Sequence, residues 1–273
     1  AFRDAKSARL AVHFTQEIDE HSRVSFIPYV RTTDMKFRRH FVPGKALEDS
    51  GHKSVGVLAS YGVTTSFGQY TLGMDAEYTS GYVHEYQPEP TVFSFITGEH
   101  YNYAVKSTVL SPYARAQLPL GARTNITLGM RGDYTHYAYD NKIDSGQFGR
   151  FIRVDDRADN FFVLTPKLGI THTLNDNIMV YGRYARGARA PQVSDAYSLQ
   201  SNQTVGEIET ETLDSFEAGL KGQIGRLNLE IAAFAMAKDN FFFRNPNGFN
   251  VVNGKTHHKG LEVEFDVPFG DIF

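Results

Sequence analysis

The sequence predicts an all-β protein, namely part of an antiparallel transmembrane β-barrel. Three observations predict it: apolar and polar residues alternate along several segments, these segments are long, and short connections alternate with long ones. Within residues 69–80, for example, Tyr70, Leu72 and Met74 fall on one face, and the other face carries polar residues and glycine. One apolar and one polar face per strand is typical of a wall between lipid and a polar interior.

The alternation predicts about eleven strands. They cover residues 8–15, 23–33, 53–66, 69–80, 108–118, 125–139, 161–173, 177–187, 212–223, 226–239 and 255–267. Most exceed the roughly 5–6 residues of strands in soluble sheets. They suit the roughly 9–11 residues that a tilted strand needs to cross a bilayer.

The connections between these strands are short and long in turn. The short ones lie at 17–22, 67–68, 119–124, 175–176 and 225, and the long ones at 34–52, 81–107, 140–160, 188–211 and 240–254. Bacterial outer-membrane barrels have tight periplasmic turns and long extracellular loops. A soluble β-sandwich would also alternate, but it would seldom keep its long loops at one end.

Composition fits this fold and excludes several others. The 273 residues include 21 Phe, 15 Tyr and 24 Gly, with no Trp and no Cys, so the chain has neither disulfides nor cysteine-based metal sites. A net charge of −3 argues against a nucleic-acid partner. Mean hydropathy is −0.36, and no stretch approaches the roughly 18 apolar residues of a transmembrane helix.

No motif predicts catalysis, a cofactor or a metal site. The sequence contains no G-x-S-x-G, H-E-x-x-H, phosphate-binding loop or G-x-G-x-x-G. The segment 140–146 is a poor calcium loop because Lys142 occupies an acidic position. Neighbouring His257 and His258 point to opposite faces of a strand and cannot chelate one metal together. We therefore expect a protein that is not an enzyme, with no cofactor and no bound metal.

Five sequence blocks in the last hundred residues carry a family resemblance. They are Thr165-Pro166-Lys167-Leu168-Gly169, Tyr181 to Pro191, Glu211 to Lys221, Asn253-Gly254-Lys255 and Gly260 to Phe265. In this order and at this spacing they resemble the β-barrel of TonB-dependent outer-membrane receptors. One departure is Thr210-Glu211, where the family commonly has Pro-Glu.

The resemblance implies a domain assignment. Residues 1–273 would be a receptor-like barrel domain truncated at both ends, with about eleven of the family's 22 strands. The N-terminal plug domain, and the TonB-binding segment with it, would lie upstream of residue 1. The implied location is the bacterial outer membrane, and the implied partners are TonB, outer-membrane lipid and a small nutrient ligand.

The resemblance also implies a function, which is TonB-dependent uptake of a ferric siderophore or a similar scarce nutrient. Haem uptake is not supported, because a haem-type box is half present at Ala188 to Pro191 and no His lies between Pro191 and Glu211. The alternatives are another outer-membrane barrel, either a porin or an autotransporter translocator, and a soluble β-sandwich binding module.

Ligand-binding candidates come from the extracellular ends of strands and from loop tips. Arg186 and Arg189 would attract an anionic chelate with their guanidinium groups. Tyr101, Tyr103 and Phe242 would supply aromatic rings from the loops. Charged residues on the polar face of the strands, such as Asp75, Glu77, Arg131 and Glu217, are expected to pair with one another inside the barrel.

Overall fold

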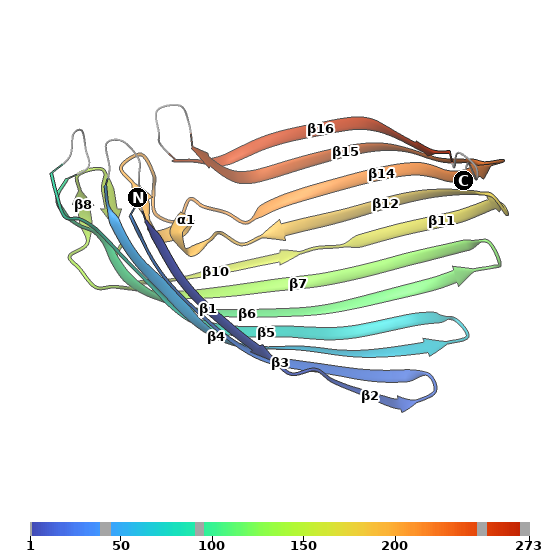
Figure 1. The fold of residues 1–273 in the computed structure, drawn as a ribbon, viewed down its shortest axis with the longest axis horizontal. Helices are drawn as coiled ribbons and strands as arrows, with labels where there is room; N and C mark the ends of the chain where they lie inside the picture. The colour runs from blue at the N-terminus through green and yellow to red at the C-terminus, as the bar shows by residue number, and fades with distance from the viewer. Residues whose placement is uncertain (1, 39–44, 91–95, 245–249, 268–273) are drawn as a thin grey trace, which may run out of the picture.

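A curved antiparallel sheet makes up most of the molecule (Figure 1). The computed structural model describes residues 2–38, 45–90, 96–244 and 250–267. The first half of the chain forms β1 (Arg3–Ala11), β2 (Phe14–Asp19), β3 (Ser22–Arg38), β4 (Leu47–Thr65), β5 (Gly68–Gln87), β6 (Gly98–Leu120) and β7 (Thr124–Asn141). The second half forms β8 (Gly146–Phe148), β9 (Phe151–Arg153), β10 (Arg157–Leu164), β11 (Lys167–Asn175), β12 (Ile178–Arg189), α1 (Val193–Tyr197), β13 (Leu199–Gln200), β14 (Glu211–Ile224), β15 (Leu227–Arg244) and β16 (Asn250–Asp266).

Sequence neighbours pair throughout the main sheet. Its order is β1-β3-β4-β5-β6-β7-β11-β12-β14-β15-β16, with β2 also pairing β3 and β10 also pairing β7. β1 and β2 pair with successive parts of β3, and β10 and β11 pair with successive parts of β7. Each of these two pairs therefore fills one position in the sheet, and the thirteen strands occupy eleven positions, or rows. This confirms the predicted antiparallel barrel wall, with tight turns at one end and the long connections at the other (Figure 1).

Strands extend further into the loops than the sequence predicts. The region 34–52 was predicted to be a loop, but β3 continues to Arg38 and β4 begins at Leu47. The predicted loops 81–107 and 240–254 are likewise shortened by paired strand residues. The period-two pattern fades beyond the apolar belt because both faces meet polar surroundings there, whereas backbone pairing continues regardless of side chain.

One strand predicted as continuous, 161–173, is divided. Pro166 has no N–H to donate, and the residues Thr165 and Pro166 separate β10 from β11. The two residues between β10 and β11 are still hydrogen-bonded to the neighbouring strands. The Thr165 N–H donates to Arg131 O of β7 at 2.8 Å, and the Arg186 N–H of β12 donates to Pro166 O at 3.0 Å.

The two faces of the sheet differ as predicted. The outer face carries exposed apolar side chains, among them Leu72, Leu128, Ile170, Phe216 and Leu261. The inner face carries the polar alternate residues. Across the described ranges, no helix combines the length and apolarity needed to span a bilayer.

Aromatic rings on the inner face lie flat against glycines of the next strand. An ideal Cβ added to Gly73 of β5 would lie 2.1 Å from Cζ of Tyr113 on β6. At Gly56 the ring of Tyr29 stands 2.4 Å from the same hypothetical atom. Only a residue without a side chain lets these rings approach the neighbouring backbone so closely.

Candidate functional site

Ion pairs and hydrogen bonds line the inner face between β1 and β7. The Arg31 guanidinium donates to Glu77 Oε1 at 2.7 Å, and the Tyr29 hydroxyl donates to Glu77 Oε2 at 2.5 Å. Arg131 lies between two carboxylates: its Nη1 is 2.5 Å from Asp75 Oδ2, and its Nε is 2.7 Å from Asp133 Oδ1. The expected pairing of inner charges is therefore present in this half of the wall.

A second polar group lies on β12, β14 and β15. The Arg183 guanidinium contacts Glu217 at 2.6 Å, and the Tyr181 hydroxyl donates to the other oxygen of the same carboxylate at 2.9 Å. Lys221 pairs with Glu230 at 2.7 Å. Like the first group, it neutralises charge within the wall.

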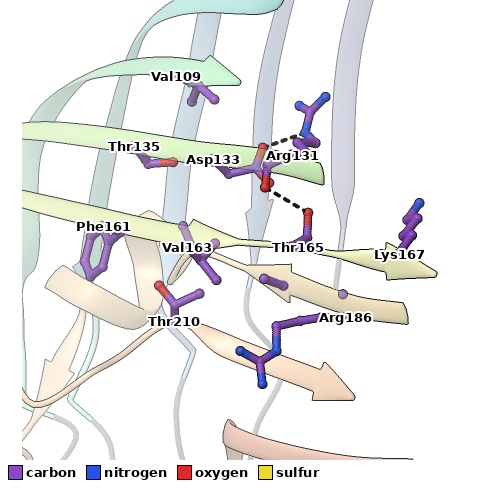
Figure 2. Close-up of a pocket in the computed structure, with 13 residues that line it drawn as sticks. Val109, Arg131, Asp133, Thr135, Phe161, Val163, Thr165, Lys167, Arg186 and Thr210 are labelled. Carbon is purple, nitrogen blue, oxygen red and sulfur yellow. Dashed lines mark hydrogen bonds and ion pairs between the residues drawn. The ribbon is translucent and has the colours of Figure 1, made fainter. Parts of the chain in front are cut away.

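A pocket of about 400 Å³ opens on the inner face between these two groups (Figure 2). Its apolar lining includes Val109, Phe161 and Val163, and its polar lining includes Arg131 and Lys167. The two cations differ, because Arg131 is held by two carboxylates. Lys167 is exposed and makes no ion pair with any residue that the structure describes, so its ammonium is the positive charge available to a ligand.

An aromatic cluster covers the loop end of the pocket face. Tyr197 of α1 is 1% exposed and stacks on Tyr139 with ring centroids 4.4 Å apart. Its ring also meets Tyr103 and Tyr137 edge-on, at 6.5 and 6.2 Å. Burial, together with the hydrogen bond that the hydroxyl donates to Asp159 at 2.8 Å, raises the pKa of Tyr197. The short helix is thereby fixed against the strands.

Two loops join over this cluster. The connection after β7 contains the β8–β9 hairpin, and β13 from the connection after β12 pairs with β9 to complete a separate three-stranded sheet. Three hydroxyls tie the second loop to the wall: Tyr101 donates to Leu199 O at 2.5 Å, Tyr137 donates to Pro191 O at 2.9 Å, and the Tyr103 hydroxyl lies 3.0 Å from Ser198 Oγ. We call α1, β8, β9 and β13 together the loop cap.

The placement of Tyr101, Tyr103 and Phe242 at loop tips was wrong. Tyr101 and Tyr103 belong to β6, where they are 4% and 1% exposed beneath the loop cap. Phe242 belongs to β15 and is half-buried. The cause is again the continuation of paired strands beyond the apolar belt. Tyr101 and Tyr103 support the loops from below, and a ligand contact for any of the three stays a prediction.

Arg186 and Arg189 lie at the loop end of β12, as expected, but both are paired. Arg186 donates from Nε and Nη2 to the two carboxylate oxygens of Asp214, at 2.8 and 2.7 Å, on the outer face that carries Tyr184 and Phe216. Arg186 therefore only borders the pocket. Arg189 contacts Glu211 at 3.0 Å on the inner face. Their ligand-binding roles remain predictions.

Sequence reasoning missed Lys167, Tyr197 and the pocket itself. Lys167 was noted only within a family block. Tyr197 lay in a segment predicted to be a loop, and nothing in its local pattern marks it as a core residue. A tyrosine inside a long loop that holds no other aromatic residue (188–211) is the one signal that could have pointed to an anchor.

Metal ligands are not gathered anywhere in the described ranges: no group of three or more His, Cys, Asp or Glu there could hold an ion. In the segment that was weighed as a calcium loop, Lys142 contacts Asp140 and the Asn141 N–H donates to Asp156 at 2.8 Å. These contacts order the loop internally.

The half-buried carboxyl of Asp195, in the loop cap, gives a pH prediction. Burial raises the pKa of Asp195, and the nearby Arg189 guanidinium opposes this only in part. Because its pKa is higher in the folded cap than in the unfolded chain, the cap loses stability as pH rises from about 4 through the folded pKa. Asp195→Asn should therefore slow hydrogen exchange of residues 193–200 at neutral pH and have no effect below about pH 4. Equal exchange in both proteins at neutral pH would contradict this.

Comparisons with known proteins agree with the fold. The family model "TonB dependent receptor-like, beta-barrel" matches residues 6–272. A curated relative, the ferric-pyoverdine M114 receptor PbuA of Pseudomonas sp. (strain M114), is 28% identical over 160 residues, which are 56% of this chain and 18% of that protein.

Solved structures of low identity show the same fold. The pyoverdine outer-membrane receptor FpvA of Pseudomonas aeruginosa PAO1, solved with pyoverdine bound, superimposes with a TM-score of 0.72 at 15% identity, covering 98% of this chain and 42% of FpvA. The copper transporter OprC gives a TM-score of 0.77 at 13% identity, covering 98% and 44%. The chain thus spans less than half the length of these neighbours.

Family membership decides against the porin, autotransporter and soluble sandwich alternatives, and both the family and its structural neighbours are receptors and transporters rather than enzymes. With its eleven-row antiparallel wall and a family match over nearly its whole length, the chain belongs to the TonB-dependent receptor β-barrel family and is a protein of the bacterial outer membrane.

Proposed function

We propose that the chain is the wall segment of a receptor that imports a ferric siderophore in a TonB-dependent manner. The single observation that carries the proposal is the pocket on the inner face, whose lining combines apolar side chains, Val109, Phe161 and Val163, with Lys167, a lysine that makes no ion pair within the described ranges. Iron chelates with carboxylate or catecholate groups are anionic, and such a ligand needs both a positive charge and an apolar contact surface. The curated relative, a ferric-pyoverdine receptor, supports the same substrate class.

The open sheet supports a larger assembly. Within the described strands, β1 pairs only with β3 and β16 only with β15, so each presents an unpaired edge. Unpaired backbone groups in lipid are costly, and a closed barrel removes them. We therefore propose that further strands complete the barrel, and that an N-terminal plug with a TonB-binding segment fills it.

Uptake by cells tests the substrate class. A strain lacking the gene, grown under iron limitation, should take up radioactive iron from at least one siderophore only after complementation with the full-length gene. Deletion of TonB should abolish that uptake. Unchanged iron uptake in the deletion strain, or restoration of copper uptake alone, would refute a siderophore substrate.

Lys167→Gln should weaken binding of an anionic ferric chelate by about tenfold, the usual effect of losing one charge-assisted contact. Binding to the purified full-length receptor can be followed by quenching of the fluorescence of a fluorescent anionic siderophore when its ferric complex binds. Lys259→Gln provides the matched control, because Lys259 lies on the outer face of β16 and is also exposed. Equal affinity of the Lys167 variant and the wild type would remove this residue from the site.

A further inference from the structure

Two lysines lie at one level on the outer face of the sheet. In the strand register, Lys53 of β4 is opposite Ser80 of β5, and Ser80 is opposite Lys106 of β6. Two strand spacings separate the lysines, which is about 10 Å between their Cα atoms. Both side chains are exposed, and neither makes an ion pair with a residue in the described part of the chain. Two flexible ammonium groups at this separation can close on one anion from either side.

Three other basic residues on this face are already neutralised. Arg186 is held by Asp214 at 2.7 Å, Lys255 lies 3.3 Å from Asp239, and Lys36 lies 3.0 Å from Asp49. Lys53 and Lys106 have no such carboxylate among the residues that the structure describes. Their charge is therefore available to an external anion.

An apolar groove of about 630 Å³ adjoins Lys53. Leu10, Val30, Val55 and Tyr78 line it, and each of these side chains is 44–65% exposed on the outer face. Along β4 the chain passes from Lys53 to Val55 and then toward the tight turn after Thr65. The groove consequently lies on the membrane side of the lysine, where the apolar belt begins.

We propose that this surface binds one lipid with a phosphorylated, anionic headgroup from the outer leaflet. Lys53 and Lys106 hold the phosphate, the Ser80 hydroxyl lies between them, and an acyl chain occupies the groove. Charge complementarity favours an anionic headgroup over a zwitterionic one, and basic residues at the edge of an apolar belt are placed at headgroup level. The proposal depends on the outer-membrane location and not on the imported substrate.

Native mass spectrometry of the delipidated full-length receptor tests this. The wild type should retain phosphatidylglycerol in preference to phosphatidylcholine, and Lys53→Gln with Lys106→Gln should reduce that preference by roughly 25-fold, about fivefold for each lysine. Lys259→Gln, on the same face but at the far side of the sheet, should keep it. Equal retention of the two lipids by the wild type, or an unchanged preference in the double variant, would overturn the proposal.

Two further experiments distinguish the contribution of the apolar groove from that of the two lysines. Ala8→Phe places a ring in the groove and should weaken retention of both lipids while leaving both lysines in place. Excess inorganic phosphate should not displace the lipid, because the acyl chain contributes to binding. Displacement by phosphate alone would show a site for the free anion and overturn the lipid assignment. Heat-dependent electrophoretic mobility confirms that each variant is folded, and Lys106→Gln alone replaces the double variant if that one fails to fold.

Discussion

Gly73→Val is expected to prevent assembly of a folded barrel in the full-length receptor. The new side chain would occupy the space of the Tyr113 ring, whose Cζ lies 2.1 Å from the position of an added Cβ. The ring cannot simply rotate away, because it also lies under the guanidinium of Arg131, 5.8 Å from its centroid. Overpacking costs about 1–3 kcal/mol where neighbours can shift, and displacing a whole ring should exceed that range.

Heat-dependent electrophoretic mobility of outer-membrane extracts measures the folded fraction. Gly62→Val is the matched control, since an added Cβ at this position of β4 would meet only the Tyr70 carbonyl oxygen, at 3.9 Å. Gly73→Val combined with Tyr113→Ala should regain part of the folded fraction by removing the clash. Normal folding of the single Gly73 variant would show that the ring does not need the glycine.

Tyr197→Ala is expected to detach the loop cap while the barrel wall stays folded. The substitution empties a site that is 1% exposed and removes the ring on which Tyr103, Tyr137 and Tyr139 pack. Large-to-small changes of a buried aromatic residue cost about 3–5 kcal/mol. Since α1 of the cap begins three residues after Ala190, which lines the pocket, affinity for the proposed siderophore ligand should fall as well.

Limited proteolysis within residues 188–211, together with ligand titration, measures both effects. Tyr197→Phe is the conservative partner, because it keeps the ring and loses only the hydrogen bond to Asp159, at a cost of about 1 kcal/mol. The phenylalanine variant should resist proteolysis nearly as well as the wild type. A cap that stays protected in the alanine variant would mean that β9 and β13 hold it without the aromatic cluster.

The repetitive part of this molecule could be predicted from its sequence because each strand carries its own two-faced pattern. Alternation in segments such as 69–80 and 125–139 reflects lipid on one side and a polar interior on the other, so eleven strands were recognisable one at a time. The interruption of the strand at Thr165 and Pro166 was not predicted, although the missing N–H of proline explains it.

The site could not be predicted in the same way, because it depends on which loops meet. Nothing in the sequence around Tyr197 shows that it packs on tyrosines 58 to 94 residues earlier in the chain. The pairing of Arg186 with Asp214 likewise follows from the register of β12 with β14, which local pattern does not fix. Arg186 and Arg189, which were chosen for their charge, therefore proved to be paired with carboxylates. Lys167, which makes no ion pair within the described ranges, was not chosen as a candidate.

The shared sheet of β8, β9 and β13 has a consequence for how such receptors can diversify. Two loops that each supply strands to one small sheet are not interchangeable modules, because a change in the length of one alters the pairing edge offered to the other. Grafting residues 142–156 alone onto another receptor would leave β9 paired with β8 but without β13, whereas transplanting both loops together would carry the complete sheet. The two loops therefore form one structural unit that can change only as a pair.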